Sequence, residues 1–175
     1  MARPFRRRRV SVARLGPGDA EALREIRLEA LALHPTAFSA DPEVEGAFTL
    51  ERWRQGLVAR DFFGGRIGGA LMGINAFSID AHSAKTSHIG HLGAMYVREA
   101  ARGTGLAGEL IDAVLAHAIG KVEQVLLTVE AENIRAIRLY ERHGFRTVGK
   151  LPRAIHVGGV YYDELQMHRA VSSGD

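Results

Sequence analysis

Apolar and polar residues follow two different spacings along the chain, and each spacing predicts a type of secondary structure. Apolar residues three or four positions apart predict amphipathic helices, whereas alternating or short continuous apolar runs predict strands. The strands predicted in this way cover residues 9–14, 62–67, 70–79, 88–97, 125–129, 145–157 and 160–167. The predicted helices follow a turn at 15–19 and end at Pro35, cover 49–58, begin near 106, and cover 133–143.

Most of the predicted helices carry one apolar stripe that should face a core. In chain order, the stripes are Leu23, Ile26, Ala30 and Leu33; then Trp53 and Leu57; then Leu106, Leu110, Val114 and Ala118. Glycine pairs at 68–69 and 158–159 are typical of tight hairpin turns. Helices and strands do not alternate strictly, so the order of elements favours an α+β fold with a mixed sheet over a doubly wound one.

The composition favours one globular domain. The chain has 175 residues, of which 46% are hydrophobic and 25% are charged, which is enough to bury a core. We expect a single domain at 9–171 after a basic tail at 1–8. The chain contains no cysteine, which excludes disulfides and thiolate metal sites. Its histidines lack a metal-ligand spacing, so no metal is expected.

The net charge of +3 has a local origin. Five positive charges belong to the arginines at 3, 6, 7, 8 and 9, and without them the remainder carries −2. A short arginine run without interleaved aromatic residues is more often a solvated tail than a nucleic-acid-binding arm. The chain also lacks an apolar run of membrane-spanning length and a secretory signal at its start. We therefore expect a cytoplasmic protein without a membrane or nucleic-acid partner.

A glycine-rich loop follows the strand at 88–97 and leads into a helix. It reads Arg102-Gly103-Thr104-Gly105-Leu106-Ala107. Gly103 and Gly105 permit a sharp turn that points backbone N–H groups outward, and the helix adds the positive end of its dipole. The loop therefore predicts an anion site, for which a phosphorylated ligand is the natural occupant.

Proteins bind three kinds of phosphorylated ligand with loops of this general kind. A P-loop requires Lys and then Ser or Thr after its last glycine, but other residue types follow Gly108. A dinucleotide fingerprint, Gly-x-Gly-x-x-Gly, starts at Gly103, and Glu123 lies twenty residues further on. This alternative is disfavoured because residues 98–102 separate the strand from the first glycine, and because Glu123 precedes an apolar run instead of ending one.

The third ligand is coenzyme A, and here the sequence resembles a known family. Arg102-x-x-Gly105-x-Ala107 is similar to the pyrophosphate loop of the GNAT N-acetyltransferases. A second block, LLTVEAENIRAIRLYERHGF, resembles the segment that follows the family's fifth strand, with matches at Asn133, Ala136, Tyr140, Gly144 and Phe145. Together with the closing segment at 159–165, the resemblance covers residues 87–169, about half of the chain.

The resemblance implies an acetyl-CoA-dependent N-acetyltransferase with a GNAT-like fold. In that fold a mixed, mostly antiparallel sheet is flanked by helices, and its central strands, here 88–97 and 125–129, splay apart around the pantetheine arm. Gly90 and Gly93 would ease such a distortion of a strand. The implied coenzyme contacts are Met95, Tyr96, Val97, Arg102, Gly103, Thr104, Gly105, Leu106, Ala107, Asn133, Ala136 and Tyr140.

Acetyl transfer to a primary amine needs a base that removes the ammonium proton and an acid that protonates the leaving thiolate. Tyr140 occupies the position of the family's usual tyrosine acid, and a core tyrosine is the alternative. Counting back along the strand, residues 95, 93 and 91 share the face of Val97, which places His91 where many family members have a glutamate. A neutral imidazole accepts a proton near pH 7. The alternative is a structural His91 with water as the proton acceptor.

The sequence does not identify the acceptor beyond an amine. A small-molecule amine and a protein N-terminus both remain open, and a homodimer is a candidate assembly. The resemblance places the acceptor between the first two helices and the last hairpin, near Phe38, Trp53, Tyr161 and Tyr162. Either Asp163 or Glu164 would hold a cationic amine. A non-catalytic acyl-CoA-binding or regulatory domain is the alternative function, against which the pair Tyr140 and His91 argues.

Overall fold

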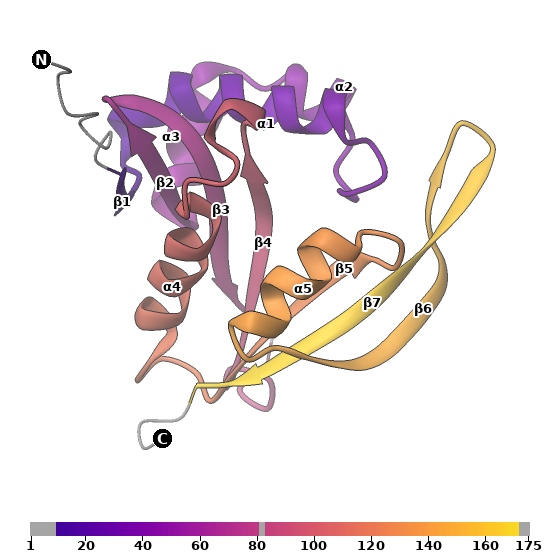
Figure 1. Cartoon of the computed structure of the whole chain (residues 1–175). Coiled ribbons are helices and arrows are strands. Elements are labelled where there is room, and N and C mark those ends of the chain that lie inside the picture. The colour runs from indigo at the N-terminus through magenta and orange to yellow at the C-terminus, as the bar shows by residue number, and fades with distance from the viewer. Residues whose placement is uncertain (1–9, 81–82, 172–175) are drawn as a thin grey trace, which may run out of the picture.

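A computed structural model of the chain describes residues 10–80 and 83–171, so the predicted basic tail at 1–8 lies outside the described residues. Within these ranges, seven strands form one sheet in the order β1-β2-β3-β4-β5-β7-β6 (Figure 1). The central pair β4 and β5 is parallel, and every other neighbouring pair is antiparallel. The predicted α+β fold with a mixed, mostly antiparallel sheet is confirmed.

The elements closely follow the predicted ones. The strands are β1 (Val10–Arg14), β2 (Asp61–Ile67), β3 (Ala70–Ile79), β4 (Ile89–Val97), β5 (Gln124–Glu130), β6 (Arg146–Val157) and β7 (Val160–Ala170). The α-helices are α1 (Ala20–Leu33), α2 (Pro42–Gly46), α3 (Leu50–Ala59), α4 (Leu106–Ala118) and α5 (Ile134–Arg142). Short 3-10 helices at Pro17–Asp19 and Glu99–Ala101 precede α1 and the glycine-rich loop. The five-residue α2 was not predicted, because it is too short to carry an apolar stripe.

Two hydrophobic cores lie on opposite faces of the sheet. Helices α1 and α3 pack on one face of the strands β2, β3 and β4, around Leu23, Ile26, Trp53 and Ile74. Helices α4 and α5 pack on the other face, where the core also contains Phe77 and residues of β5 and β7. Figure 1 shows the two helical layers and the β6–β7 hairpin, which extends beyond them.

One position of the predicted α1 stripe is wrong. Leu33 is 63% exposed, whereas Leu31 and the charged Arg27 are buried. Arg27 donates to both carboxylate oxygens of Glu45 from α2, at 2.9 and 3.0 Å. Its buried guanidinium therefore has an ion-pair partner. Leu31 lies one helical turn after Arg27, on the same face. A stripe drawn from apolar residues alone omits Arg27, and the prediction therefore ends the stripe at Leu33 instead of Leu31.

Strand β4 contains a bulge that changes which residues share a face. Ile74 pairs with Tyr96, but Ala76 pairs with Gly93, so β4 has one extra residue opposite β3. The bulge coincides with Ala94, which has a left-handed φ of 52°. Because a bulge shifts the alternation of side chains by one residue, positions before and after it no longer share a face by simple counting.

The expectation that His91 shares the face of Val97 is therefore wrong. Val97 and Met95 pack against the core on the α4 side. His91 lies before the bulge, next to Leu92, whose side chain is buried in that same α4-side core. Adjacent residues of a strand point to opposite faces, so His91 points to the α1–α3 side.

The central strands separate as predicted. β4 and β5 pair only from Ile89 with Gln124 to His91 with Leu126, after which β5 continues along β7. Gly90, within the paired part, makes room for a core side chain instead of easing the bulge. A Cβ at residue 90 would lie 2.4 Å from Cε2 of the buried Phe77, whereas a Cβ at Gly93 would meet no atom within 4 Å.

This contrast predicts that two glycine-to-alanine changes in the same strand have different effects on stability. Gly90→Ala should lower the free energy of unfolding by about 1–3 kcal/mol, because the new methyl group overpacks a buried ring. Gly93→Ala is the matched control and should change it by less than about 0.5 kcal/mol. Urea denaturation followed by fluorescence measures both. Equal stabilities for the two variants would contradict the close approach of Gly90 to Phe77.

Candidate functional site

The glycine-rich loop forms a row of free backbone donors at the start of α4. Gly103 and Gly105 have φ values of 79° and 90°, a conformation that side chains other than glycine adopt at a cost. Gly105 is the N-cap of α4 and offers no side chain to cap it. Among the described residues, none accepts a hydrogen bond from the backbone N–H of Gly103, Gly105, Ala107 or Gly108. We call these four groups the donor cradle.

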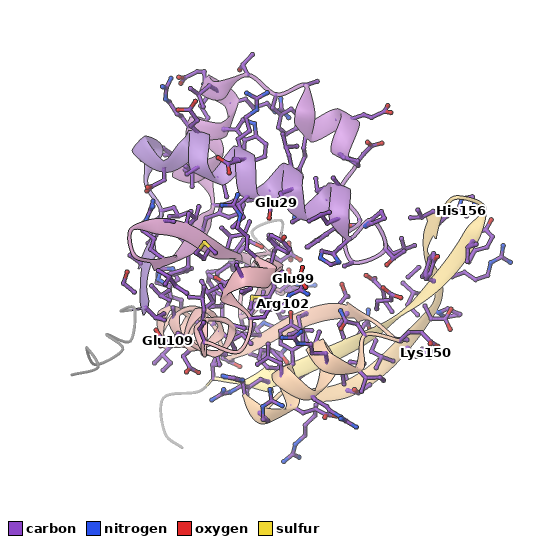
Figure 2. All side chains as sticks on the ribbon, turned by 45° about the horizontal axis from the view of Figure 1, so that its top comes forward. Glu29, Glu99, Arg102, Glu109, Lys150 and His156 are labelled. Carbon is purple, nitrogen blue, oxygen red and sulfur yellow. The ribbon has the colours of Figure 1, made fainter. Side chains whose placement is uncertain are left out.

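Two sets of contacts hold the donor cradle in place. The Thr104 hydroxyl donates to the Ala101 carbonyl at 2.7 Å, which closes the turn from within. Arg98, at the end of β4, donates to Glu29 at 2.9 Å and to Glu25 at 2.6 Å, which ties the loop to α1. Figure 2 shows Glu99 in the 3-10 helix before this loop, Arg102 on the loop and Glu109 in α4. The loop is therefore fixed before any ligand arrives.

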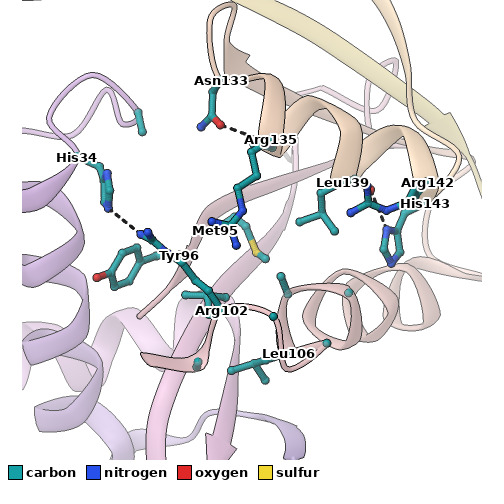
Figure 3. A pocket seen from close by; sticks show the side chains of 18 of the residues that line it. His34, Met95, Tyr96, Arg102, Leu106, Asn133, Arg135, Leu139, Arg142 and His143 are labelled. Atoms are coloured by element: carbon teal, nitrogen blue, oxygen red, sulfur yellow. Dashed lines mark hydrogen bonds between the residues drawn. The ribbon is translucent and has the colours of Figure 1, made fainter. Parts of the chain in front are cut away.

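A cavity of about 650 Å³ opens beside the donor cradle. Its walls come from the end of α1, the end of β4, the loop, and one face of α5 (Figure 3). Met95, Val97, Phe38 and Leu139 give it an apolar wall. We call it the coenzyme cavity from here on, after the ligand that the loop predicts.

The charges around the coenzyme cavity favour an anion. Arg102, Arg135 and Arg142 line it, and no aspartate or glutamate is among the described residues that do. None of the three arginines forms an ion pair within the described part of the chain. Nη2 of Arg102 lies 3.5 Å from Nε2 of the His34 ring, which is not a carboxylate. Free guanidinium groups and helix N-terminal amides both bind phosphate oxygens.

Tyr96 forms part of the wall between the coenzyme cavity and α1. Its hydroxyl donates to Oε1 of Glu29 at 2.8 Å. Burial and this hydrogen bond raise the pKa of Tyr96 to about 12, since both disfavour a phenolate next to a carboxylate. Tyr96 therefore remains a neutral donor that orients the wall.

Helix α5 presents Asn133 and Tyr140 differently. The Asn133 side chain caps the helix, since its Oδ1 accepts from the Ala136 N–H at 3.1 Å, and it also lines the coenzyme cavity. Tyr140 is buried with its ring edge-on to Phe145, the two ring centroids 5.9 Å apart, and it is not among the residues that line the cavity. Burial raises the pKa of Tyr140 above its usual value, so its hydroxyl keeps its proton near neutral pH.

A second cavity, also about 650 Å³, lies on the other face of the sheet between helices α1 and α3 and strands β2, β3 and β4. His91 lines it, and so do Gly93 and Ala94 at the start of the bulge. The next residues, Met95 and Tyr96, line the coenzyme cavity. The bulge of β4 is therefore the wall that the two cavities share.

The structure brings most of the predicted coenzyme contacts together. The coenzyme cavity is lined by Met95, Tyr96, Val97, Arg102, Gly103, Gly105, Leu106, Ala107, Asn133 and Ala136, and by Phe38 from the predicted acceptor set. Thr104 and Tyr140 lie outside its lining, and His91 and Trp53 line the second cavity. Tyr161 stacks on His156 in the β6–β7 hairpin, and Tyr162 pairs with Ile155 there; neither lines a described cavity.

Several lining residues were not predicted. Arg135, Leu139 and Arg142 of α5, and His143 directly after it, line the coenzyme cavity together with Ala136. Helical spacing from Ala136 would have found Leu139 and His143, which lie three and seven residues after it, but not the two arginines. His34 is the C-cap of α1 and reaches the coenzyme cavity from the opposite side.

The described residues contain no cluster of three or more His, Asp or Glu side chains that is suited to a metal ion. In this part of the chain no helix is long and apolar enough to cross a membrane.

Comparison with known proteins identifies related sequences and folds. Mycothiol acetyltransferase from Thermobispora bispora is 37% identical over 122 residues, which cover 66% of this chain and 41% of that protein. The chain spans less than half the length of the curated relatives it matches. A GNAT-family acetyltransferase from Streptococcus pneumoniae has the same fold, with a TM-score of 0.81 at 21% identity over 93% of this chain and 99% of that one. A Salmonella typhimurium structure solved with its cofactor acetyl-CoA gives a TM-score of 0.77 at 19% identity over 95% and 96%.

The match extends from α1 to the end of α5. The model of the acetyltransferase (GNAT) family matches residues 21–145, which include the donor cradle, the bulge of β4 and the α5 face of the coenzyme cavity. This segment is more than two thirds of the chain, and the chain therefore belongs to the GNAT acetyltransferase family.

Proposed function

We propose that the protein is an N-acetyltransferase that transfers the acetyl group of acetyl-CoA directly to a primary amine. The observation that carries this proposal is the donor cradle, whose four free N–H groups face a cavity with three unpaired arginines and no carboxylate. The related fold solved with acetyl-CoA supports the choice of ligand. The pyrophosphate would bind the cradle and Arg102, and the apolar wall at Met95 and Leu139 would hold the pantetheine arm.

Tyr140 is the proposed general acid. Its ring is buried one helical turn after Ala136, and its raised pKa keeps the hydroxyl protonated, so that it can donate a hydrogen bond to a group that becomes a strong acceptor. The thiolate that forms as the C–S bond breaks is such a partner, since it gains a hydrogen bond that the intact thioester does not need.

His91 is the proposed general base. It is exposed and lines the second cavity next to the bulge, so it receives a proton only from an amine that approaches on the α1–α3 side. Under this proposal the two substrates lie on opposite sides of β4. Nitrogen attack on the thioester carbon then expels the thiol, while the ammonium proton passes to the His91 imidazole directly or through water.

Gly105→Val should abolish tight acetyl-CoA binding. A β-branched side chain resists the φ of 90° and occupies the space that a phosphate would take. Gly120→Val is the matched control, because Gly120 has a φ of 75° at the far end of α4, away from the coenzyme cavity. Calorimetry should show at least about a tenfold weaker affinity for the first variant and an unchanged affinity for the second.

Two results would overturn the coenzyme assignment. One is a folded Gly105→Val protein that binds acetyl-CoA as tightly as the parent. The other is a parent protein that prefers NAD, the ligand of the rival dinucleotide fingerprint.

Tyr140→Phe should lower turnover by about 10- to 10,000-fold with little change in acetyl-CoA affinity, because it removes only the hydroxyl used during thiolate departure. The ring remains against Phe145, so the fold should persist. Steady-state kinetics with a pre-steady-state burst test separates chemistry from product release. Unchanged turnover, with chemistry shown to limit the rate, would leave Tyr140 a structural residue.

His91→Gln should remove an acidic limb from the pH profile of kcat/KM while leaving acetyl-CoA binding intact. The limb arises because a charged imidazole accepts no proton. Tyr140 contributes no limb near neutral pH, since its pKa is raised above that of an ordinary phenol. Two acceptors of different amine pKa are needed, because acceptor ionisation produces a similar limb. A limb that follows the acceptor and survives in His91→Gln would assign proton removal to water or another group.

A further inference from the structure

The second cavity has two chemically different walls. Its helical wall contains three arginines: Arg27 from α1, Arg52 from α3 and Arg60 directly after α3. Its sheet wall contains His91 and Ser78, which pair across β4 and β3, with Gly93 and Ala94 of the bulge beside them. A molecule that fills the space between these walls meets cationic groups on one side and the proposed base on the other.

The positive charge of the helical wall is not neutralised by carboxylates among the described residues that line the cavity. Glu45 is the one carboxylate among the described lining residues, and both its oxygens already accept from Arg27. Arg52 lies over the Phe48 ring at 4.0 Å, and neither Arg52 nor Arg60 has an ion-pair partner among the described residues. Three arginines against one glutamate leave the lining with two positive charges in excess. Such a wall attracts a carboxylate and repels a polyamine.

Two buried donors in the same wall have no partner. Nη1 of Arg27 and Nε1 of Trp53 form no hydrogen bond with any residue that the structure describes, although the two residues are only 8% and 7% exposed. A buried N–H without an acceptor costs roughly 1–3 kcal/mol, so native structures rarely leave one without a reason. Both residues line the second cavity, so a ligand oxygen bound there is a candidate acceptor for these two N–H groups.

We propose that the second cavity is the acceptor site and that it selects a small amine which also carries a carboxylate. The carboxylate binds the helical wall at Arg27, Arg52 and the Trp53 N–H. The amine then lies toward His91 and the bulge, where the thioester reaches from the other side. This inference rests on the proposed function, because it assigns the acceptor of that same reaction.

The test compares acceptors that differ only in the carboxylate. Phenylalanine and methionine are each measured against the carboxamide of the same amino acid, with acetyl-CoA and a thiol-release assay. The parent should favour the carboxylate member in kcat/KM relative to a variant with a weakened wall. Reporting the carboxylate-to-carboxamide ratio for each protein cancels the different intrinsic reactivities of the two amines, because that difference is the same for every variant.

Arg52→Gln should lower this ratio by about tenfold, the scale of one lost charge-assisted hydrogen bond. Arg54→Gln is the matched control, since Arg54 is on the same helix, pairs with Glu51 and does not line the cavity. Both positions are exposed, so both variants should fold. Acetyl-CoA affinity should be unchanged in each.

Trp53→Phe separates a binding role from a structural one. It keeps an aromatic ring but removes the N–H, so it should raise KM for the carboxylate acceptor more than for its carboxamide. A purely structural Trp53 predicts equal effects on both acceptors. As a measurement that does not depend on catalysis, 3-phenylpropionate, which has no amine, should compete with the acceptor and not with acetyl-CoA.

The outcomes distinguish this inference from the proposed function. If amines are acetylated, but the ratio is the same in the parent, Arg52→Gln and Arg54→Gln, the acceptor assignment is wrong and the N-acetyltransferase stands. If acetyl-CoA binds but no amine or peptide N-terminus releases CoA, the proposed function fails and the acceptor assignment fails with it.

Discussion

The extra residue in β4 is the constraint on which the rest of the site depends. Opposite the bulge stands Asn75, fully buried, whose Nδ2 donates to the Leu110 carbonyl in the middle of α4 at 2.7 Å. The Leu110 carbonyl belongs to α4 and Asn75 belongs to β3, so this hydrogen bond joins the two elements beside the bulge. The bulge, β3 and α4 are therefore held as one unit. Because α4 begins at the donor cradle, the same unit fixes the cradle relative to the gap between β4 and β5.

Carboxylates are placed so that the coenzyme cavity stays positive. Glu25 and Glu29 of α1 are engaged by Arg98 and the Tyr96 hydroxyl, and neither glutamate lines the cavity. The cavity itself retains free guanidinium groups and free amides. A fixed set of donors binds an anion without first reorganising, which is how a rigid loop binds phosphate tightly. The ion pairs that anchor the loop therefore also prevent the anchoring acids from neutralising the site.

The sequence predicts this architecture well where local chemistry determines it. Glycines with positive φ, the helix after them and the Asn133 cap are visible in residue types and spacing. Gly93 indicated a distortion of β4 and lies at the start of the bulge, but the residue that forms the bulge is not visible, because Ala94 has no property that marks a left-handed residue. Counting across it therefore put His91 on the wrong face. Arg27 was missed for a related reason: its burial depends on Glu45, eighteen residues away, which no local pattern reports.

Under the proposed function, the bulge separates two proton transfers as well as two substrates. His91 receives the ammonium proton on the α1–α3 side, and Tyr140 donates to the thiolate from the α5 side. The two groups belong to different faces of the sheet, so neither has to change its protonation state for the other to act. The acetylated amine and the free thiol also leave through different cavities. Direct transfer needs only that nitrogen, carbonyl carbon and sulfur meet at the one place where β4 departs from β5, and the fold provides a single such place among the described strands.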